Sequence, residues 1–505
     1  MRTKLFCLIL LTMLILSSCQ NDAVQTVGPV GPAAPKNAGE GENQSIVLNY
    51  AASDSMNPYK TKSEANLLLM PLLYEPLISV NENFEAVLKA AQAVDNQGST
   101  CVVTLKEGLV FSDGKALTAD DVVYSLTTAK SSGTVFAPRL SNISTVKNDG
   151  GTIKITLKTA DPFFHLCLDI PLIPKNSQSQ NNPAGSGPYA FKSENGAVSL
   201  VYNEKHTGPV PRIKEIKLTE MPDYETTVRS LDIGSISLFY TDFSEGDISL
   251  SNSTFSPVPL NHLVYLGVNS KNEKLDATVR KAVNLALDRA AVTEKAFLGR
   301  ALPSTGPFHP SFVSAKAVQK GSAVKNTEAA VALLEEAGYT QKDDKGIRRT
   351  KGGKRLTFQL LVNKDNAAKQ RAAVQIAEAL KLAGIQATVV SESMDKYKKR
   401  LEDGEYDLYL SEIKLSNHMN LAPLLTPGAP TGYGVHEEDT TLQNYKSFLK
   451  GDKNMEAFIT DFEAALPFIP LCYRQGLLAH VQGLSGLRPS VSSLFENITQ
   501  WTTQS

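Results

Sequence analysis

The stretch VVTLKEGLVFSDGKALTADDVVYSL, residues 102–126, carries the clearest local signal in the chain. Its first residues alternate as those of a half-buried strand do, and the Ser-Asp-Gly-Lys sequence after Phe111 predicts a tight turn in which Gly114 takes a positive φ. Thr118 then stands where a helix N-cap is expected, with Asp121 three residues later as the acidic partner of a capping box. The stretch therefore predicts a strand, a turn and a capped helix, and none of these has catalytic character.

As a string, the same stretch resembles the segment L+xGvxFxDGxxlTAxDVvySl of the family 5 extracytoplasmic solute-binding proteins of ABC importers. That family includes oligopeptide, dipeptide and nickel binders. The resemblance extends over nearly all of Ser45 to Ser490. Further motifs that resemble the family's patterns in chain order are YEPL (residues 74–77), GSGPY (185–189), DATVRKAVNLALDR (276–289), NTEAAVALLEEAGY (326–339) and YDLYL (406–410).

The resemblance implies an α/β fold: a two-lobed periplasmic-binding-protein type II (cluster C) fold with mixed sheets, a hinge and an extra inserted domain. A chain of 505 residues is also too long for one hydrophobic core. We expect domain I, with the hinge strands, to be discontinuous, domain II to be inserted into lobe 1, and domain III to form lobe 2. The expected ranges are 45–70, 185–262 and 472–505 for domain I, 71–184 for domain II, and 263–471 for domain III.

The N-terminus predicts export and lipid attachment. Arg2 and Lys4 precede a short apolar run, and Leu16-Ser17-Ser18-Cys19 matches a lipoprotein cleavage box. Residues 1–18 are therefore interpreted as a lipoprotein signal peptide, with an ordinary signal peptide that happens to contain a cysteine as the alternative. Residues 19–44 read as a flexible tether of about 25–30 Å reach. We expect the chain to be anchored by lipid at Cys19 on the extracytoplasmic face of the cell membrane.

Composition and motifs argue against nucleic-acid binding and catalysis. The chain has 51 basic and 52 acidic residues, so it has no excess of positive charge. Its seven histidines form no metal-binding motif, and the GGKR sequence lacks the Ser or Thr that a P-loop requires. Ser186 lies between adjacent glycines, which is not the spacing of a nucleophile elbow. The prediction is a binding protein that is not an enzyme and has no cofactor.

Two further expectations concern packing. In the predicted helix over 276–289, Asp276 serves as N-cap, and Arg280 and Arg289 lie outside the apolar face. The cysteines that remain after Cys19 are Cys101, Cys167 and Cys472. A Cys101–Cys167 disulfide is one interpretation, and buried free thiols are the favoured one.

Ligand identity is where the chain departs from the family pattern. Peptide binders of the family often carry a W…aDYxdP stretch after the YDL strand. Its aspartate pairs with the peptide's α-ammonium, and its tryptophan lines a side-chain pocket. That aspartate is absent here. Glu412 offers a carboxylate nearby, but at a different register, and the only tryptophan is Trp501. The predicted ligand-binding residues are Asn57, Tyr59, Asn417, His418, Asn420 and Tyr433, with no metal site.

The predicted function is capture of a solute, most simply an oligopeptide, and its delivery to a membrane permease with an associated ATPase. A binder of a nickel chelate or another small molecule is the alternative within the family. A peptide-sensing receptor or a surface scaffold without transport is an alternative from another class. An extracellular hydrolase would need a nucleophile or an acid–base pair, which the sequence does not show.

Overall fold

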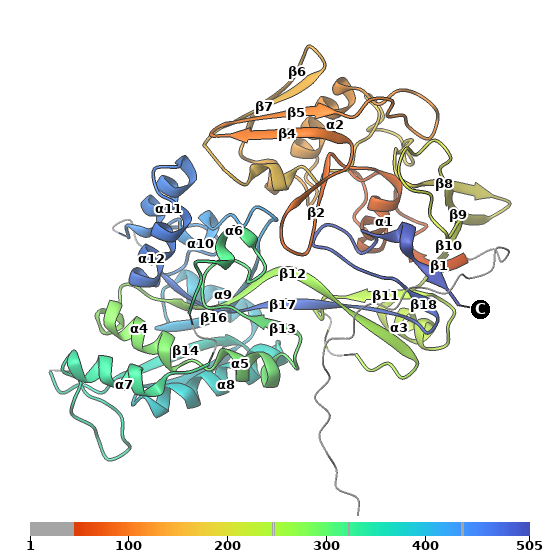
Figure 1. Ribbon diagram of the computed structural model, residues 1–505. Coiled ribbons are helices and arrows are strands. Elements are labelled where there is room, and N and C mark those ends of the chain that lie inside the picture. Colours follow the sequence, from red (N-terminus) through yellow and green to blue (C-terminus); the bar gives the residue numbers. More distant parts are fainter. Residues whose placement is uncertain are drawn as a thin grey trace, which may run out of the picture. The chain divides into compact units, whose positions relative to one another are not determined.

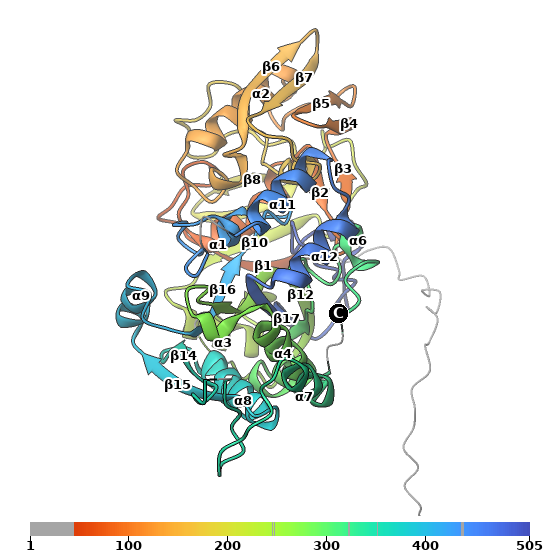
Figure 2. The ribbon, with the colours of Figure 1, turned by 90° about the vertical axis from the view of Figure 1, so that its left-hand side faces the viewer.

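The computed structural model describes residues 45–244, 246, 248–321, 324–350, 352–435 and 439–504. These residues belong to one compact unit, residues 43–505, which Figures 1 and 2 show in two perpendicular views. The predicted signal peptide, the Cys19 lipidation site and the tether lie outside the described residues.

The first sheet contains the first strand of the described chain. β1 (Ser45–Tyr50) runs parallel to β10 (Glu215–Glu220), and β9 (Ala197–Tyr202) and β8 (Tyr189–Glu194) continue the sheet in antiparallel fashion. α1 (Glu64–Leu73) lies against β1 and β8. This sheet is thus assembled from segments that lie more than 130 residues apart in the chain.

The second sheet is antiparallel and local in sequence. Its order is β4 (Ala91–Gln97), β5 (Thr100–Leu105), β7 (Thr152–Leu157) and β6 (Ile143–Asp149), and α2 (Ala119–Ser131) packs against β6 and β7. The hairpin of β2 (Ile78–Val80) and β3 (Ala86–Leu88) and two short 3-10 helices, Pro138–Leu140 and Phe164–Cys167, accompany it. In Figure 1 the second sheet forms the orange layer above the other two sheets.

The strand, turn and capped helix predicted for residues 102–126 are confirmed. β5 ends at Leu105, and Gly114 has a φ of +89°. Thr118 donates from its backbone N–H and from Oγ1 to Asp121 Oδ2 at 2.8 and 2.7 Å, and α2 starts at Ala119. The local sequence is sufficient here because each contact joins residues only a few positions apart.

The third sheet is the largest. Its main path is β11 (Leu238–Thr241), β17 (Phe468–Val481), β12 (Ser253–Val268), β16 (Leu408–Lys414), β14 (Thr357–Asn363) and β15 (Gln386–Glu392), with β13 (Ala301–Pro303) paired to β17. β12 and β17 pair along most of their length, with register shifts between Pro259 and Leu263 and between Val264 and Tyr265. These two long strands lie side by side within the third sheet, and β17 also pairs with β11 at its edge (Figure 1).

Several helices pack on the third sheet and on one another. α8 (Ala367–Leu382) and α9 (Met394–Glu402) pack on the parallel pair β14–β15, and α4 (Ala277–Ala286) packs on α7 (Thr327–Glu336) and α8. The remaining elements are α3 (Tyr224–Asp232), α5 (Arg289–Ala291), a π-helical turn (Val292–Ala296), α6 (Val313–Lys316), α10 (Ala422–Leu425), α11 (Thr441–Lys450), α12 (Met455–Ala465), β18 (Leu484–Ser485), β19 (Thr502–Thr503) and 3-10 turns at Glu273–Leu275 and Ile498–Gln500.

One packing expectation is wrong and another is confirmed. Asp276 caps α4 by accepting from Val279 N–H, but α4 ends at Ala286 and Arg289 is 2% exposed. Arg289 donates to the Pro470 carbonyl at 2.9 Å and to the Asn284 side chain, so the broken helix turns it inward. Cys101, Cys167 and Cys472 are buried free thiols, as favoured. Within the described residues, no helix is both long and apolar enough to span a membrane.

Candidate functional site

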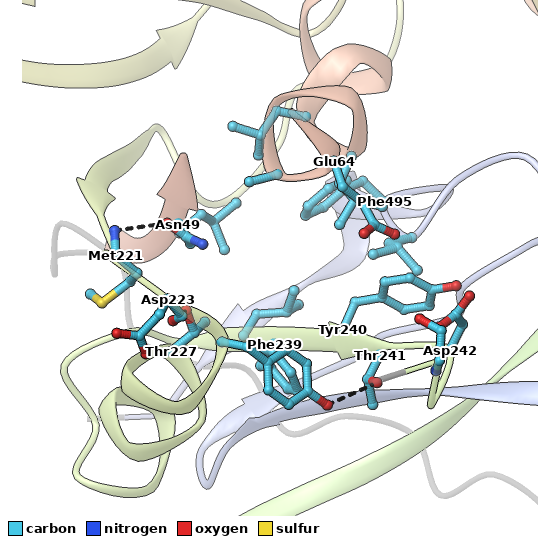
Figure 3. Close-up of a pocket in the computed structure, with 18 residues that line it drawn as sticks. Asn49, Glu64, Met221, Asp223, Thr227, Phe239, Tyr240, Thr241, Asp242 and Phe495 are labelled. Atoms are coloured by element: carbon cyan, nitrogen blue, oxygen red, sulfur yellow. Dashed lines mark hydrogen bonds between the residues drawn. The ribbon is translucent and has the colours of Figure 1, made fainter. Parts of the chain in front are cut away.

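Two adjoining cavities are lined in common by α1, β11 and the C-terminal segment at Leu494. The first, here called the acidic cavity, has a volume of about 270 Å³ and lies among β1, α1, α3 and β11 (Figure 3). The second, called the mixed-charge cavity, has a volume of about 250 Å³. Leu68, Tyr240 and Leu494 line both cavities.

The acidic cavity takes its character from three carboxylates that sit at element boundaries. Glu64 is the first residue of α1, after the N-cap Ser63. Asp223 caps α3 by accepting from Thr226 N–H at 2.7 Å, and Asp242 follows β11 directly and accepts from Ser244 N–H at 2.8 Å. None of the described residues that line this cavity is a lysine, arginine or histidine.

Aromatic rings form the walls between these carboxylates. Tyr224, Phe239, Tyr240 and Phe495 line the acidic cavity, and Tyr224 packs edge-on against Phe239 at a centroid distance of 5.4 Å. In Figure 3 the Tyr240 ring lies between the side chains of Glu64 and Asp242. Aromatic faces and carboxylates both attract cations, so this lining suits a positively charged group.

The ionisation of Tyr240 and Asp242 reflects this environment. Burial, and then the carboxylates of Asp242 and Glu64, raise the pKa of the Tyr240 phenol. Burial opposes ionisation of Asp242, but its hydrogen bonds from Ser244, together with the charges of His262 and Arg474, leave its pKa below the ordinary value. Asp242 is therefore anionic and Tyr240 is neutral at physiological pH.

The mixed-charge cavity is lined by segments from all parts of the described chain. They are α1, Arg139 and Asp169, Tyr240 of β11, residues 258–262 of β12, residues 414–417 at the end of β16 and beyond it, and residues 490–494. Asp169 pairs with Arg139 and also accepts from Asn417 Nδ2 at 2.8 Å and from Ser492 Oγ at 3.0 Å. Three separate segments thus converge on the Asp169 carboxylate.

Asn261 marks this cavity as polar. Its side chain is 8% exposed, and its Nδ2 donates to Asn417 Oδ1 at 2.7 Å. Its Oδ1 has no hydrogen-bond partner among the described residues. A buried amide oxygen without a partner costs about 1–3 kcal/mol, so a ligand donor at this position would recover that free energy.

Glu412 lies beside these cavities, and its charge is neutralised by the protein. Its carboxylate contacts His262 Nδ1 at 3.0 Å, Arg474 Nη1 at 2.9 Å and Lys369 Nζ at 3.0 Å. Burial opposes its ionisation, but these three groups hold its pKa well below the ordinary range. Glu412 is therefore engaged by three basic side chains before any ligand arrives.

Comparison with known proteins identifies the family. Residues 84–432 match the family model described as bacterial extracellular solute-binding proteins, family 5 Middle. The chain belongs to this family. It is 27% identical over 383 residues to the oligopeptide-binding protein AppA of Bacillus subtilis, covering 70% of each chain.

A second relative supports the same assignment, and a solved structure has a similar fold. The chain is 28% identical over 366 residues to the nickel-binding periplasmic protein of Escherichia coli, covering 67% of this chain and 69% of that one. Its fold is similar to that of a nickel ABC transporter protein from Bacillus halodurans, with a TM-score of 0.74 at 19% identity, covering 91% of this chain and 100% of that one. The mixed α/β architecture is thus the two-lobed fold of the family 5 proteins.

Two of the predicted ligand residues have structural partners in this family 5 chain. Asn57 is fully buried, and its Nδ2 donates to the carbonyls of Gln178 and Gln180 at 3.2 and 2.9 Å. The Tyr59 hydroxyl donates to the Pro171 carbonyl. Neither residue lines the acidic or the mixed-charge cavity.

The four other predicted ligand residues differ in position. Asn417 lines the mixed-charge cavity, whereas His418, Asn420 and Tyr433 line neither cavity. His418 Nδ1 lies 2.8 Å from Cys167 Sγ. Asn420 Oδ1 accepts from Ala422 N–H, and the Tyr433 carbonyl accepts from the Tyr406 hydroxyl.

The cavity-lining residues that the sequence reasoning missed are Glu64, Arg139, Asp169, Tyr240 and Asp242. Arg139 and Asp169 stand in no motif that would have singled them out. The segment LFYTD, residues 238–242, held a signal: an acidic residue placed directly after a short apolar and aromatic strand. Polar residues at strand ends are frequently functional in α/β proteins.

Proposed function

We propose that this family 5 protein is the substrate-binding lipoprotein of an ABC importer and that its ligand is of the oligopeptide type. The observation that carries the proposal is the pair of adjoining cavities with different charge. The acidic cavity offers carboxylates, and the mixed-charge cavity adds Arg139, His262 and Lys414. A peptide matches both because it carries an ammonium group, a carboxylate and backbone amides that donate and accept hydrogen bonds.

The proposed domain division gives a mechanism for capture. Domain I (45–70, 185–262 and 472–505) contains the first sheet, domain II (71–184) the second, and domain III (263–471) most of the third. β12 crosses the proposed boundary at 262–263, and β17 crosses the one at 471–472. These crossing strands act as the hinge, and a ligand that contacts both lobes favours the closed form. A permease with its ATPase then receives the closed, loaded protein.

The lipid anchor at Cys19 is a separate part of the proposal. It is supported by the cleavage box Leu16-Ser17-Ser18-Cys19 in the sequence. Substitution Cys19→Ser is expected to move the protein from the membrane fraction to the soluble fraction after cell lysis. Retention of the variant in the membrane fraction would contradict lipidation at this residue.

A small-molecule or nickel-chelate ligand is the second candidate, because one relative is named as nickel-binding. Among the described residues, no group of three or more His, Cys, Asp or Glu side chains could hold a metal ion. A chelate would therefore have to be recognised mainly through its organic part. Under this alternative the protein still serves uptake.

Native mass spectrometry of the gently purified full chain tests the choice. Denaturation of the same sample releases any bound molecule for identification. A series of peptide masses supports the peptide proposal, and a single metal-containing or small organic mass supports the second candidate. Protein that carries no ligand, and that peptides do not stabilise in a thermal-shift screen, would overturn the peptide proposal.

A further inference from the structure

We propose that the acidic cavity holds the ammonium group of the ligand, with Glu64 and Asp242 as the carboxylates and Tyr240 as the aromatic wall. This inference rests on the proposed function and specifies the ligand class: peptides with a free amino terminus. It places the ammonium site on α1 and β11. The family's usual aspartate, in contrast, follows the strand that here is β16, Leu408–Lys414.

Figure 3 shows two carboxylates placed around one aromatic ring. The Glu64 and Asp242 side chains lie on either side of the Tyr240 ring and come from segments 178 positions apart. The two carboxylates contribute to the electrostatic environment of the same phenol. A cation in this space is attracted by two negative charges and by an aromatic face together.

Two acidic groups near the acidic cavity, Glu412 and Asp169, are already held by several side chains of the protein. Glu412 is bound by His262, Lys369 and Arg474, as described above. Asp169 is bound by Arg139, Asn417 and Ser492. Asp242 differs because its only hydrogen bonds in the described chain come from Ser244, and a carboxylate can accept about four.

The neighbouring basic side chains define the geometry further. Arg474 donates from Nη2 to the Asp242 carbonyl and from Nη1 to Glu412, and His262 contacts Glu412. Arg474 and His262 thus lie on the Glu412 side of Asp242 and do not line the acidic cavity. The ligand ammonium is therefore expected on the Glu64 side of Asp242, with the rest of the peptide directed past Tyr240 into the mixed-charge cavity.

The size of the cavity agrees with this orientation. Its volume of about 270 Å³ is several times the roughly 30 Å³ that one water molecule occupies in the liquid. It therefore accommodates an ammonium group together with its first side chain. The shared residues Leu68, Tyr240 and Leu494 then form the passage to the mixed-charge cavity and the amides of Asn261 and Asn417.

The test is a competition that does not require the natural ligand. A random pentapeptide library without lysine or arginine is prepared in free and N-acetylated forms. The two forms are mixed equally and incubated with the full chain purified in detergent. Bound peptides are recovered by gel filtration and denaturation, and mass spectrometry gives the ratio of free to acetylated peptide. Wild type is expected to enrich free-amine peptides at least tenfold.

The variants Glu64→Gln and Asp242→Asn are expected to bring that ratio to within about twofold of one. Glu107→Gln, which removes an exposed carboxylate that lines neither cavity, is expected to keep the wild-type ratio. Circular dichroism and melting temperature identify a variant that does not fold, and the two separate substitutions provide independent readings.

The outcomes separate the inference from the proposed function. Recovery of peptides by wild type without preference for the free amine would overturn the inference and leave the proposed function standing. Enrichment that persists in both folded variants would also overturn the inference. Recovery of neither peptide form would overturn the proposed function itself.

Discussion

At the scale of single residues, His309 shows how burial couples a side chain to pH. Its ring is fully buried between Phe84 and Tyr473, at centroid distances of 4.8 and 4.7 Å. Its Nδ1 accepts from Ser311 N–H at 3.0 Å, and its Nε2 has no partner among the described residues. Burial lowers its pKa to about 3, far below the ordinary value of 6.5.

The sign of the stability effect follows from this shift. The unfolded chain binds a proton at His309 as pH falls below 6.5, whereas the folded chain does so only near pH 3. The contribution of neutral His309 is therefore complete above pH 6.5 and is lost as pH falls toward 3. The loss of this contribution between pH 7 and pH 5 should lower the free energy of unfolding by about 2 kcal/mol.

Urea unfolding of wild type and His309→Gln at both pH values measures this contribution. The variant is expected to lose about 2 kcal/mol less than wild type over that pH range. The loss of the variant must be compared with that of the wild type, because burial also lowers the pKa of His165, His418 and His480 and these residues contribute to both losses. An unchanged pH dependence in the variant would contradict the assignment to His309.

Gly185 lies so close to the backbone of α1 that a larger side chain would clash with it. A Cβ at this position would lie 1.9 Å from the carbonyl oxygen of Leu73, the last residue of α1. Gly185→Ala is therefore expected to destabilise the protein by about 2–4 kcal/mol in urea unfolding. Gly352→Ala is the control, since only Thr350 Oγ1 lies near, at 3.9 Å, and its cost should be below about 1 kcal/mol. Equal costs would contradict the steric explanation.

At the scale of elements, the N-terminus of α2 depends on one carboxylate. Asp121 accepts three hydrogen bonds: two from Thr118 and one from Lys175 N–H at 2.8 Å. Asp121→Ala is expected to lower the free energy of unfolding by about 2–3 kcal/mol, because it removes three hydrogen bonds to a buried carboxylate. Urea unfolding measures this loss.

The adjacent Asp120 provides the matched control on the same helix turn. It is exposed and pairs with Lys175 Nζ at 3.1 Å. Asp120→Ala removes the same charge near the helix N-terminus but should cost less than about 1 kcal/mol. If both substitutions cost the same, helix-dipole charge rather than hydrogen bonding would explain the stability of this helix start.

At the scale of the whole molecule, the loop after β16 joins the proposed lobes. Asn417 donates to Asp169 at 2.8 Å and accepts from Asn261 at 2.7 Å, so it connects domain III with residues of domains I and II. Removal of this side chain should favour the open form. Asn417→Ala is therefore expected to increase the radius of gyration of the ligand-free protein in small-angle X-ray scattering and to weaken ligand binding.

Asn420→Ala is the control for this prediction. Asn420 bonds only within its own lobe in the described chain, to Ala422 N–H and the Tyr445 hydroxyl. Its removal should leave the radius of gyration unchanged. An unaltered scattering profile for Asn417→Ala would mean that other contacts between the lobes, such as His418 with Cys167, are sufficient to hold them.

The local elements and the family can be recognised from the amino-acid sequence alone. The capping residues Thr118 and Asp276 and the turn at Gly114 follow from contacts within a few residues, and a motif such as YDLYL is a continuous string. Short-range contacts cost little loop-closure entropy and are therefore readable from local pattern.

Which charged side chains remain available to a ligand depends, in contrast, on tertiary contacts. Glu412 is neutralised by His262, Lys369 and Arg474, which lie between 43 and 150 positions away, and Arg289 is buried because the helix before it breaks. Glu64 and Asp242 share one cavity because α1 and β11 meet through β1 and the C-terminal segment. Such long-range contacts depend on the packing of whole elements, and no local pattern specifies them.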